Sequence, residues 1–295
     1  MTTLKIGNTP LIELTKEIRV PNSARIFAKL ERENDGGSIK SRVALALIED
    51  GEKRGLLKQG GAVVEATSGN TGIGLALVAK AKGYKALIFM PKNSAEHAVA
   101  GVQGYGGEVV FTPDEEGMLG AVKRAATFAE RQENCYYANQ FHNPVCALVH
   151  TQTTGREIWA QVQGKADIFV AGIGTGGTLT GVSRWLKEKN PALQTVGVEP
   201  ASSPLLSKGW TGAHRIQGIG ANFIPPILDK SVIDEMLTAT EEEALFWVNR
   251  LQAEVGIAVG LSSGAALAAC MCLAERKQNA GKNIVTIFPD GGARN

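Results

Sequence analysis

Two stretches of this sequence repeat one pattern, in which an apolar run, a glycine-rich turn, a helical pattern and a second apolar run follow one another. The expected elements of the first stretch are a strand at 62–66, a turn at 67–72, a helix at 73–82 and a strand at 86–90. Those of the second stretch are a strand at 168–171, a turn at 172–177, a helix at 178–188 and a strand at 195–198. A strand, a helix and a second strand in this order are typical of the βαβ unit of a parallel sheet. The repeat therefore predicts an α/β protein with two doubly wound open-sheet domains.

The length of the chain agrees with two domains. At 295 residues it exceeds the usual range of about 100–200 residues for a single domain. A strand at 108–111 and a helix at about 115–130 extend the first half, and Asn143-Pro144 is the expected seam between the halves. A cleft between two such halves is where we expect a ligand to bind.

The charge and the apolar pattern exclude several classes of partner. The formal net charge of +2 gives no electrostatic reason to expect nucleic acid or an anionic membrane. No apolar run approaches the roughly 18 residues of a membrane span, and the first residues lack the pattern of a signal peptide. We therefore expect a cytoplasmic protein.

The cysteines and histidines show no metal-ligand spacing. Cys270 and Cys272 fall two residues apart in a helical pattern, where their side chains do not share a face. The four histidines are scattered along the chain, without an H-E-x-x-H spacing. We expect reduced structural thiols and no metal site.

The glycine-rich turn after the strand at 168–171 allows three interpretations. Its short side chains let the backbone approach an anion, and the following helix offers N–H groups, which favours a phosphate cradle at 174–178. The same stretch contains G-x-G-x-x-G, and Glu199 stands near the spacing of the acid that binds a dinucleotide ribose. The third interpretation is a tight turn without a ligand. The spacing alone leaves all three open.

Gly260-Leu261-Ser262-Ser263-Gly264 has the form of the G-x-S-x-G elbow of serine hydrolases. That fold requires its histidine after the serine, and the last histidine of this chain is His214. The hydrolase interpretation is therefore disfavoured, and a serine at a helix start more often caps the helix or contacts a ligand.

Lys40 follows two glycines, which would let its amine come close to a bound ring. A lysine in such a loop is most often a solvated charge. Arg42 would lower the pKa of the Lys40 amine if the two side chains were buried together. Chemistry alone leaves the role of Lys40 open.

Seven ordered motifs carry a resemblance to a known family. They are Ile6 to Leu11, Lys29 to Glu31, Gly36 to Lys40, Glu65 to Gly72, Gly172 to Gly181, Ile216 to Ala221, and Gly260 to Gly264. On these motifs the chain resembles the cysteine synthase and cystathionine β-synthase group of pyridoxal phosphate enzymes, with the fold called type II, over nearly its whole length. This resemblance favours the phosphate cradle over the dinucleotide site.

The resemblance implies a role for each matching residue. Lys40 looks like the lysine that forms the internal aldimine and later moves the α proton, and Asn70 matches the residue that bonds the cofactor's phenolic oxygen. Ser262 matches the residue that faces the pyridine nitrogen, a neutral partner that favours loss of a β leaving group over transamination. The residues expected to hold the cofactor phosphate are Gly174, Thr175, Gly176, Gly177 and Thr178, and those expected to clamp the substrate α-carboxylate are Thr67, Ser68, Asn70, Thr71 and Gln140.

The reaction implied is β-replacement on O-acetyl-L-serine, through an aminoacrylate, to give cysteine from sulfide or a related sulfur donor. The partners implied are this small amino acid, the sulfur donor, a second copy in a homodimer, and, as one option, serine acetyltransferase. The resemblance also implies a larger cofactor-binding domain at 1–34 and 144–295, and a smaller mobile domain at 35–143 that carries the substrate loop.

The chain departs from the pattern of the family next to Lys40, where Asp35 and Ser41 replace the usual proline and aspartate. These changes keep two alternatives open. One is a cystathionine β-synthase-like enzyme, or one that eliminates from serine or cysteine and releases hydrogen sulfide. The other is a binding or regulatory protein that has kept the fold and lost efficient chemistry.

Overall fold

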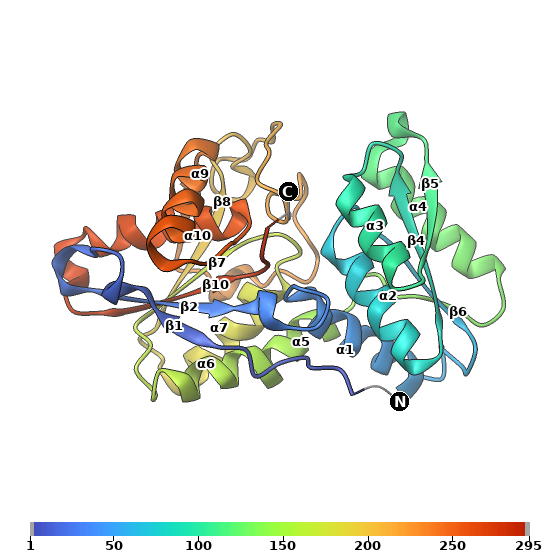
Figure 1. Cartoon of the computed structure of the whole chain (residues 1–295), viewed down its shortest axis with the longest axis horizontal. Helices are drawn as coiled ribbons and strands as arrows, with labels where there is room; N and C mark the ends of the chain where they lie inside the picture. The colour runs from blue at the N-terminus through green and yellow to red at the C-terminus, as the bar shows by residue number, and fades with distance from the viewer. Residues whose placement is uncertain (1–2, 293–295) are drawn as a thin grey trace. The chain divides into compact units, whose positions relative to one another are not determined.

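The computed structural model describes residues 3–292, and within this range the chain divides into two compact units. The first unit combines the described residues up to Ile6 with Asn34–Cys146, and the second combines Gly7–Glu33 with the residues from Ala147 onward. Each unit contains one sheet (Figure 1). The larger predicted domain, at 1–34 and 144–295, includes residues 1–2 and 293–295, which lie outside the described range.

The first unit is built on a four-stranded parallel sheet. Its strands lie in the order β5-β4-β3-β6. In chain order the elements are α1 (Lys40–Lys53), β3 (Ala62–Ala66), α2 (Asn70–Lys82), β4 (Lys85–Pro91), α3 (Glu96–Gly104), β5 (Glu108–Thr112), α4 (Gly117–Arg131) and β6 (Cys135–Tyr137).

Helices cover both faces of this sheet. Consecutive residues of a strand point to opposite faces. Phe89 of β4 packs against Ala121 and Ala125 of α4. Its neighbour Ile88 lies against α2, where a Cβ added at Gly72 would be 3.0 Å from Ile88 Cγ2. The first unit is therefore doubly wound, as the sequence predicts.

The second unit is built on a six-stranded sheet in the order β1-β2-β10-β7-β8-β9. Only the pair of β1 and β2 is antiparallel among these strands of the described chain. One face packs on α9 and α10 in a core that includes Ile168, Val196 and Ile284. The elements are β1 (Leu11–Glu13), β2 (Arg25–Leu30), α5 (Val145–Val149), α6 (Gly155–Gln161), β7 (Ile168–Gly172), α7 (Gly177–Lys189), β8 (Gln194–Pro200), α8 (Leu205–Lys208), β9 (Glu235–Ala239), α9 (Glu241–Arg250), α10 (Leu261–Ala274) and β10 (Asn283–Phe288).

The predicted βαβ repeats are present, with shifts at the helix starts. Helix α2 begins at Asn70 and not at 73, because the residues expected in the turn form its first helical turn after Gly69. The helix expected from 115 begins at Gly117, since a 3₁₀ turn precedes it and Gly117 adopts a φ of +55°. These boundaries matter because Asn70 and Thr71 are predicted site residues.

The helices of residues 3–292 include none with both the length and the apolar character needed to cross a bilayer.

Candidate active site

Lys40 is the first residue of α1, and its side chain is half-buried. Two glycines before it, Gly36 and Gly37, adopt φ values of +87° and +73°, a region that favours glycine. The Lys40 carbonyl oxygen is packed against α2, where a Cβ added at Gly74 would lie 3.0 Å from it. The glycine at 74 thus lets the start of α1 contact α2 about one turn after Asn70.

Arg42 and Lys40 both lie in the first turn of α1. Residues two positions apart on a helix point in different directions. Arg42 is 2% exposed, whereas Lys40 is half-buried. The influence of Arg42 on the pKa of the Lys40 amine remains a prediction.

The predicted carboxylate clamp is divided between a loop and a helix of the first unit. Thr67 is buried and its Oγ1 accepts a 3.2 Å hydrogen bond from the N–H of Gly69, while Ser68 is exposed. Asn70 and Thr71 lie in the first turn of α2, where Gly69 has no side chain with which to cap the helix. Such a helix start presents backbone donors and a positive dipole end, which suit a carboxylate.

Gln140 lies beside this helix start, although it is 69 residues from Thr71 in the sequence. The Thr71 hydroxyl donates a 2.6 Å hydrogen bond to Gln140 Oε1, and both side chains are buried. The structure therefore brings Gln140 into contact with a clamp residue of the distant 67–71 segment.

Glu65 is a residue of this region that sequence reasoning assigned no role. It is completely buried in β3, and its carboxylate accepts hydrogen bonds from the backbone N–H groups of Ala66 (2.8 Å) and Gln140 (2.9 Å). Burial raises the pKa of the Glu65 carboxyl to about 7, although both hydrogen bonds oppose the rise. A carboxylate within the apolar run of 62–66 was the signal that could have identified it.

In the second unit, the turn at 172–177 has the close backbone packing of an anion cradle. A Cβ added at Gly174 would lie 2.1 Å from the carbonyl oxygen of Gly218, and Gly176 has a φ of +84°. Helix α7 begins at Gly177, after Gly176, which has no side chain, and the Gly177 N–H donates to Thr175 Oγ1 at 3.4 Å. The set of donors is therefore backbone N–H groups with hydroxyls at Thr175 and Thr178, which fits a phosphate group.

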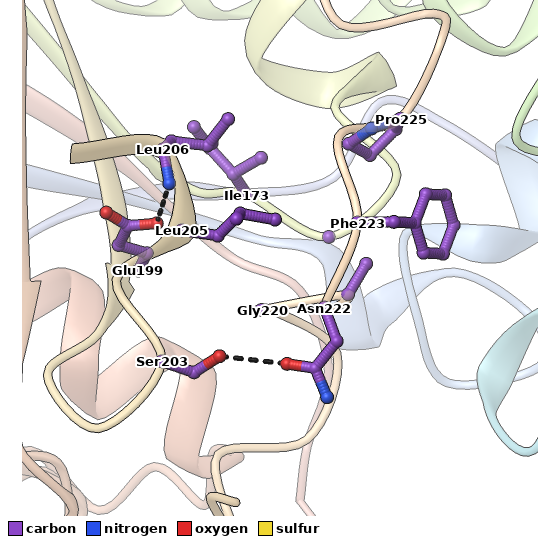
Figure 2. Close-up of a pocket in the computed structure, with 11 residues that line it drawn as sticks. Ile173, Glu199, Ser203, Leu205, Leu206, Gly220, Asn222, Phe223 and Pro225 are labelled. Carbon is purple, nitrogen blue, oxygen red and sulfur yellow. Dashed lines mark hydrogen bonds between the residues drawn. The ribbon is translucent and has the colours of Figure 1, made fainter. Parts of the chain in front are cut away.

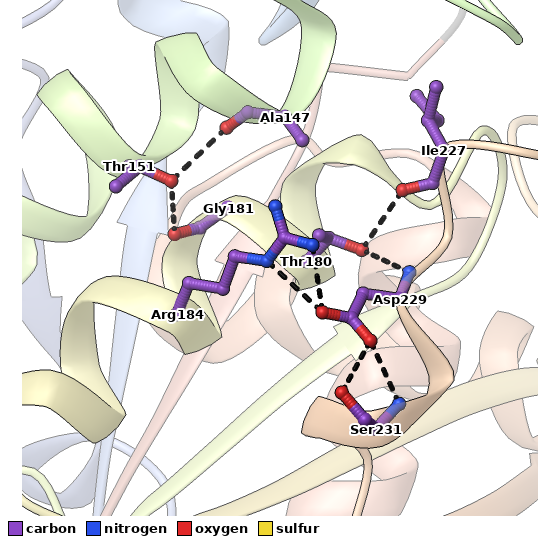
Figure 3. Close-up of polar contacts among 8 residues, drawn as sticks. All are labelled: Ala147, Thr151, Thr180, Gly181, Arg184, Ile227, Asp229 and Ser231. Carbon is purple, nitrogen blue, oxygen red and sulfur yellow. Dashed lines mark hydrogen bonds and ion pairs between the residues drawn. The ribbon is translucent and has the colours of Figure 1, made fainter. Parts of the chain in front are cut away.

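Two neighbouring segments hold α7 in place (Figure 3). Arg184 donates two hydrogen bonds to Oδ2 of Asp229, at 3.1 and 2.8 Å, and the backbone N–H of Asp229 donates to Thr180 Oγ1 at 3.0 Å. On the other side, the Thr151 hydroxyl donates to the carbonyl oxygen of Gly181 at 2.9 Å. These contacts fix the helix whose first residues belong to the predicted phosphate loop.

His150 is a second residue that sequence reasoning did not assign. Its Nε2 hydrogen-bonds with Thr178 Oγ1 at 3.3 Å, and its Nδ1 hydrogen-bonds with Thr154 Oγ1 at 2.9 Å. It begins a π-helical turn at His150–Thr154, which brings it to α7. No motif or spacing in the sequence indicated this contact.

Ser262 is buried in the first turn of α10, which begins after Gly260 without a side-chain cap. It lies in the same unit as the residues of the predicted phosphate loop. The neighbouring Ser263 hydroxyl is buried and has no hydrogen-bond partner within residues 3–292. A buried polar helix start of this kind fits a polar ligand atom better than a hydrolase nucleophile.

The Glu199 carboxylate is hydrogen-bonded to backbone groups of its own unit. Its carboxylate accepts from the backbone N–H groups of Leu206 and Ser207, both at 2.9 Å. It lines a small pocket, partly open to solvent, together with Gly174 and Asn222, whose side chain accepts a hydrogen bond from Ser203 (Figure 2). These contacts explain an acid at this position without a dinucleotide.

The two departures next to Lys40 contact each other. The Ser41 hydroxyl donates a hydrogen bond to the carbonyl oxygen of Asp35. The Asp35 N–H donates to the Lys5 carbonyl oxygen at 2.8 Å, and Asp35 Oδ2 accepts from the Lys5 N–H at 2.6 Å. Asp35 and Ser41 therefore fasten the turn before Lys40 through hydrogen bonds.

Comparison with known proteins agrees with these features. Residues 2–290 match the family described as "Pyridoxal-phosphate dependent enzyme". A cysteine synthase of Staphylococcus aureus is 43% identical over 290 residues, which cover 98% of this chain and 93% of that protein. The solved structure of a cysteine synthase from Entamoeba histolytica has a TM-score of 0.92 and 38% identity, covering 98% of this chain and 86% of that one. The solved structure of a hydrogen sulfide-producing enzyme from Fusobacterium nucleatum has a TM-score of 0.90 and 38% identity, covering 98% of this chain and 96% of that one.

Proposed function

Because this chain belongs to the pyridoxal-phosphate dependent enzyme family, we propose that it makes L-cysteine by replacing the acetoxy group of O-acetyl-L-serine with sulfide or a related sulfur donor. The structural observation that carries the proposal is the position of Lys40. This half-buried amine begins α1, against the helix whose first turn contains Asn70 and Thr71. An amine, a helix start for a carboxylate and a separate phosphate cradle are the groups that this chemistry requires.

The predicted residues would hold the cofactor at its aldehyde, phenolic oxygen, phosphate and pyridine nitrogen. The Lys40 amine of the first unit would hold the cofactor covalently through its aldehyde, and Asn70 would donate to its phenolic oxygen. In the second unit, Gly174, Thr175, Gly176, Gly177 and Thr178 would hold the phosphate, and Ser262 would face the pyridine nitrogen. The bound cofactor supplies an electron sink for the amino acid's α-carbon.

The amino acid would be held by its α-carboxylate. Thr67, Ser68, Asn70, Thr71 and Gln140 offer hydroxyls, amides and the N–H groups of a helix start. With the amino acid bound, the neutral amine of Lys40 would remove the α proton as acetate leaves the β-carbon. When hydrosulfide adds to the β-carbon, the Lys40 ammonium returns the proton to the α-carbon, so that sulfide and O-acetylserine give cysteine and acetate.

The visible absorption of the purified protein tests this function. We expect an absorption band from the bound cofactor that changes on addition of O-acetyl-L-serine and is restored by sulfide, with cysteine as the product. The Lys40→Ala variant should lose the covalent link and turnover. A wild-type band that ignores both O-acetylserine and sulfide would contradict the proposal.

A second function is favoured by the similarity to the hydrogen sulfide-producing enzyme. The same residues could act on cysteine or serine if water or another nucleophile completed the reaction. Comparison of initial rates with O-acetylserine plus sulfide and with cysteine alone distinguishes the two. Faster release of sulfide from cysteine would favour the second function.

We also propose that the protein forms a homodimer and that serine acetyltransferase is a possible partner, because the family resemblance implies both. Light scattering of the purified protein measures its oligomeric state. Co-elution with a purified serine acetyltransferase tests binding to that partner.

A further inference from the structure

Glu65 is the fourth residue of β3 and has no exposed surface. A buried carboxylate is unfavourable unless hydrogen bonds or charges compensate for the lost water. The two partners of Glu65 are backbone N–H groups, of Ala66 and Gln140, and neither carries a charge. The free-energy cost of burying Glu65 suggests that its side chain has a specific role.

The backbone of Gln140 provides that reason. The ladder between β3 and β6 ends at the pair Val64 and Tyr137, after which the Ala138 N–H donates to the Val64 carbonyl oxygen at 2.9 Å. Asn139 then adopts a φ of +53°, which turns the chain away from the strand. The next N–H, that of Gln140, bonds to Glu65 Oε2 at 2.9 Å. Without this acceptor a buried donor at Gln140 would lose its partner.

The side chain of the same residue reaches the helix start. Gln140 Oε1 accepts the 2.6 Å hydrogen bond from Thr71. A continuous series of contacts therefore runs from Glu65 through the backbone and side chain of Gln140 to Thr71. All of these residues belong to the first unit.

We propose that Glu65 is a positioning residue for the amino-acid substrate, which holds Gln140 in place to bind the substrate α-carboxylate. This inference rests on the proposed function, because it assigns Gln140 and Thr71 to the carboxylate clamp. Glu65 itself touches neither the substrate nor the cofactor in this role.

Glutamine is a poor replacement for this glutamate. Both oxygens of the carboxylate accept from N–H groups, whereas a glutamine side chain has one oxygen and one NH₂ group. In Glu65→Gln the NH₂ group would face either the Ala66 or the Gln140 N–H, so one of the two hydrogen bonds must be lost. The volume of the side chain stays nearly the same, which limits other effects.

The first experiment measures the segment that Glu65 holds. Hydrogen–deuterium exchange of peptides that cover residues 138–141 should be at least about tenfold faster in Glu65→Gln than in the wild type. Glu199→Gln is the matched control, because Glu199 is also a buried carboxylate that accepts two backbone N–H groups, in the second unit. The control should leave exchange at 138–141 unchanged. Unchanged exchange in Glu65→Gln would overturn the inference whether or not the protein makes cysteine.

The second experiment measures substrate binding. The KM for O-acetyl-L-serine, and the dissociation constant of L-alanine from titration of the cofactor absorption, should both rise about tenfold in Glu65→Gln. The cofactor content should stay at the wild-type level. In a Gln140→Ala background the Glu65→Gln change should raise these constants less than twofold further, because the group that Glu65 positions is already absent. A full tenfold effect in that background, or an unchanged KM, would show that Glu65 has only a structural role.

The two experiments separate the inference from the proposed function. If the wild type binds L-alanine but does not convert O-acetylserine, the proposed reaction fails while the binding measurements still test Glu65. If the wild type converts O-acetylserine and Glu65→Gln behaves like Glu199→Gln, the inference fails alone.

Discussion

The hydroxyl of Thr71 donates a 2.6 Å hydrogen bond to Oε1 of Gln140, and both side chains are buried. The bond fixes the orientation of the Gln140 amide, because its oxygen is occupied. The NH₂ group is then the part of Gln140 that can donate to a substrate carboxylate.

Replacing Thr71 by valine, which has nearly the same shape, should raise the KM for O-acetyl-L-serine about tenfold with a smaller change in kcat. The reason is that valine leaves Gln140 Oε1 without its donor and frees the amide to rotate. Steady-state kinetics measure the effect. Thr71→Ser retains a hydroxyl and is the control, which should stay within about threefold of the wild type. Equal losses in the valine and serine variants would show that the methyl group of Thr71, and not its hydroxyl, matters.

The raised pKa of Glu65 predicts that stability falls as the pH rises. Below pH 4.5 the carboxyl is protonated in the folded and the unfolded chain, so it adds no pH dependence there. Between pH 4.5 and about 7 the unfolded chain has lost the proton while the folded chain retains it, so rising pH favours unfolding. The full difference is on the order of 3 kcal/mol. Tyr137 and Cys146, which Glu65 influences, both have raised pKa values and stay neutral in this range.

The distribution of aromatic residues lets this prediction be measured for one unit. All 4 tyrosines lie in the first unit and all 4 tryptophans lie in the second. Urea unfolding between pH 5 and pH 8, followed by tyrosine absorbance, should show that the wild type loses about 3 kcal/mol relative to Glu65→Gln. If the free energy of unfolding, measured by tyrosine absorbance, changed with pH in the same way in the wild type and in Glu65→Gln, the raised pKa of Glu65 would be contradicted.

Gly174→Ala should reduce cofactor binding by more than about tenfold. The added Cβ would lie 2.1 Å from the Gly218 carbonyl oxygen, and two backbone segments cannot separate without moving the predicted phosphate loop. Cofactor retained after dialysis, measured by its absorption, reports the loss. Gly104→Ala is the control, since an added Cβ meets nothing within 4 Å at this helical position and should leave binding unchanged. Full retention of the cofactor by Gly174→Ala would remove the loop from the phosphate site.

Much of the fold follows from local sequence patterns, and the elements that were missed have physical reasons. The strand at 62–66 and the helix after Gly176 were readable because apolar periodicity changes abruptly at glycine. Strand β2 was not identified, because it carries Lys29, which is completely buried and forms a 2.8 Å ion pair with Glu157. A lysine in the core contradicts any pattern based on hydrophobicity.

Only part of the candidate site could be predicted, because some of its residues are recognised only by their tertiary contacts. Lys40, Thr71 and Gln140 were identified through a resemblance, and their roles remain proposals. Glu65 and His150 act on these segments through contacts of 2.9 and 3.3 Å that depend on tertiary structure. Neither residue lies at a spacing from its partner that a periodic pattern could reveal.

The last prediction concerns the two departures from the family pattern beside Lys40. Restoring the usual proline by Asp35→Pro should lower the free energy of unfolding of the first unit by about 1 kcal/mol, although proline restricts the unfolded chain. Proline has no N–H to donate to Lys5 and no carboxylate to accept from it, so two hydrogen bonds of 2.8 and 2.6 Å are lost together. Urea unfolding followed by tyrosine absorbance measures the change.

Asp35→Asn keeps the N–H and an oxygen acceptor, so it should lose less than half as much stability. Ser41→Ala should lose an amount similar to Asp35→Pro, because it removes the other contact of the same turn. If Asp35→Pro were instead more stable than the wild type, the hydrogen bonds of Asp35 would be incidental. Stabilisation of the turn by Asp35 and Ser41 together supports an enzyme that reaches the same geometry before Lys40 with different residues.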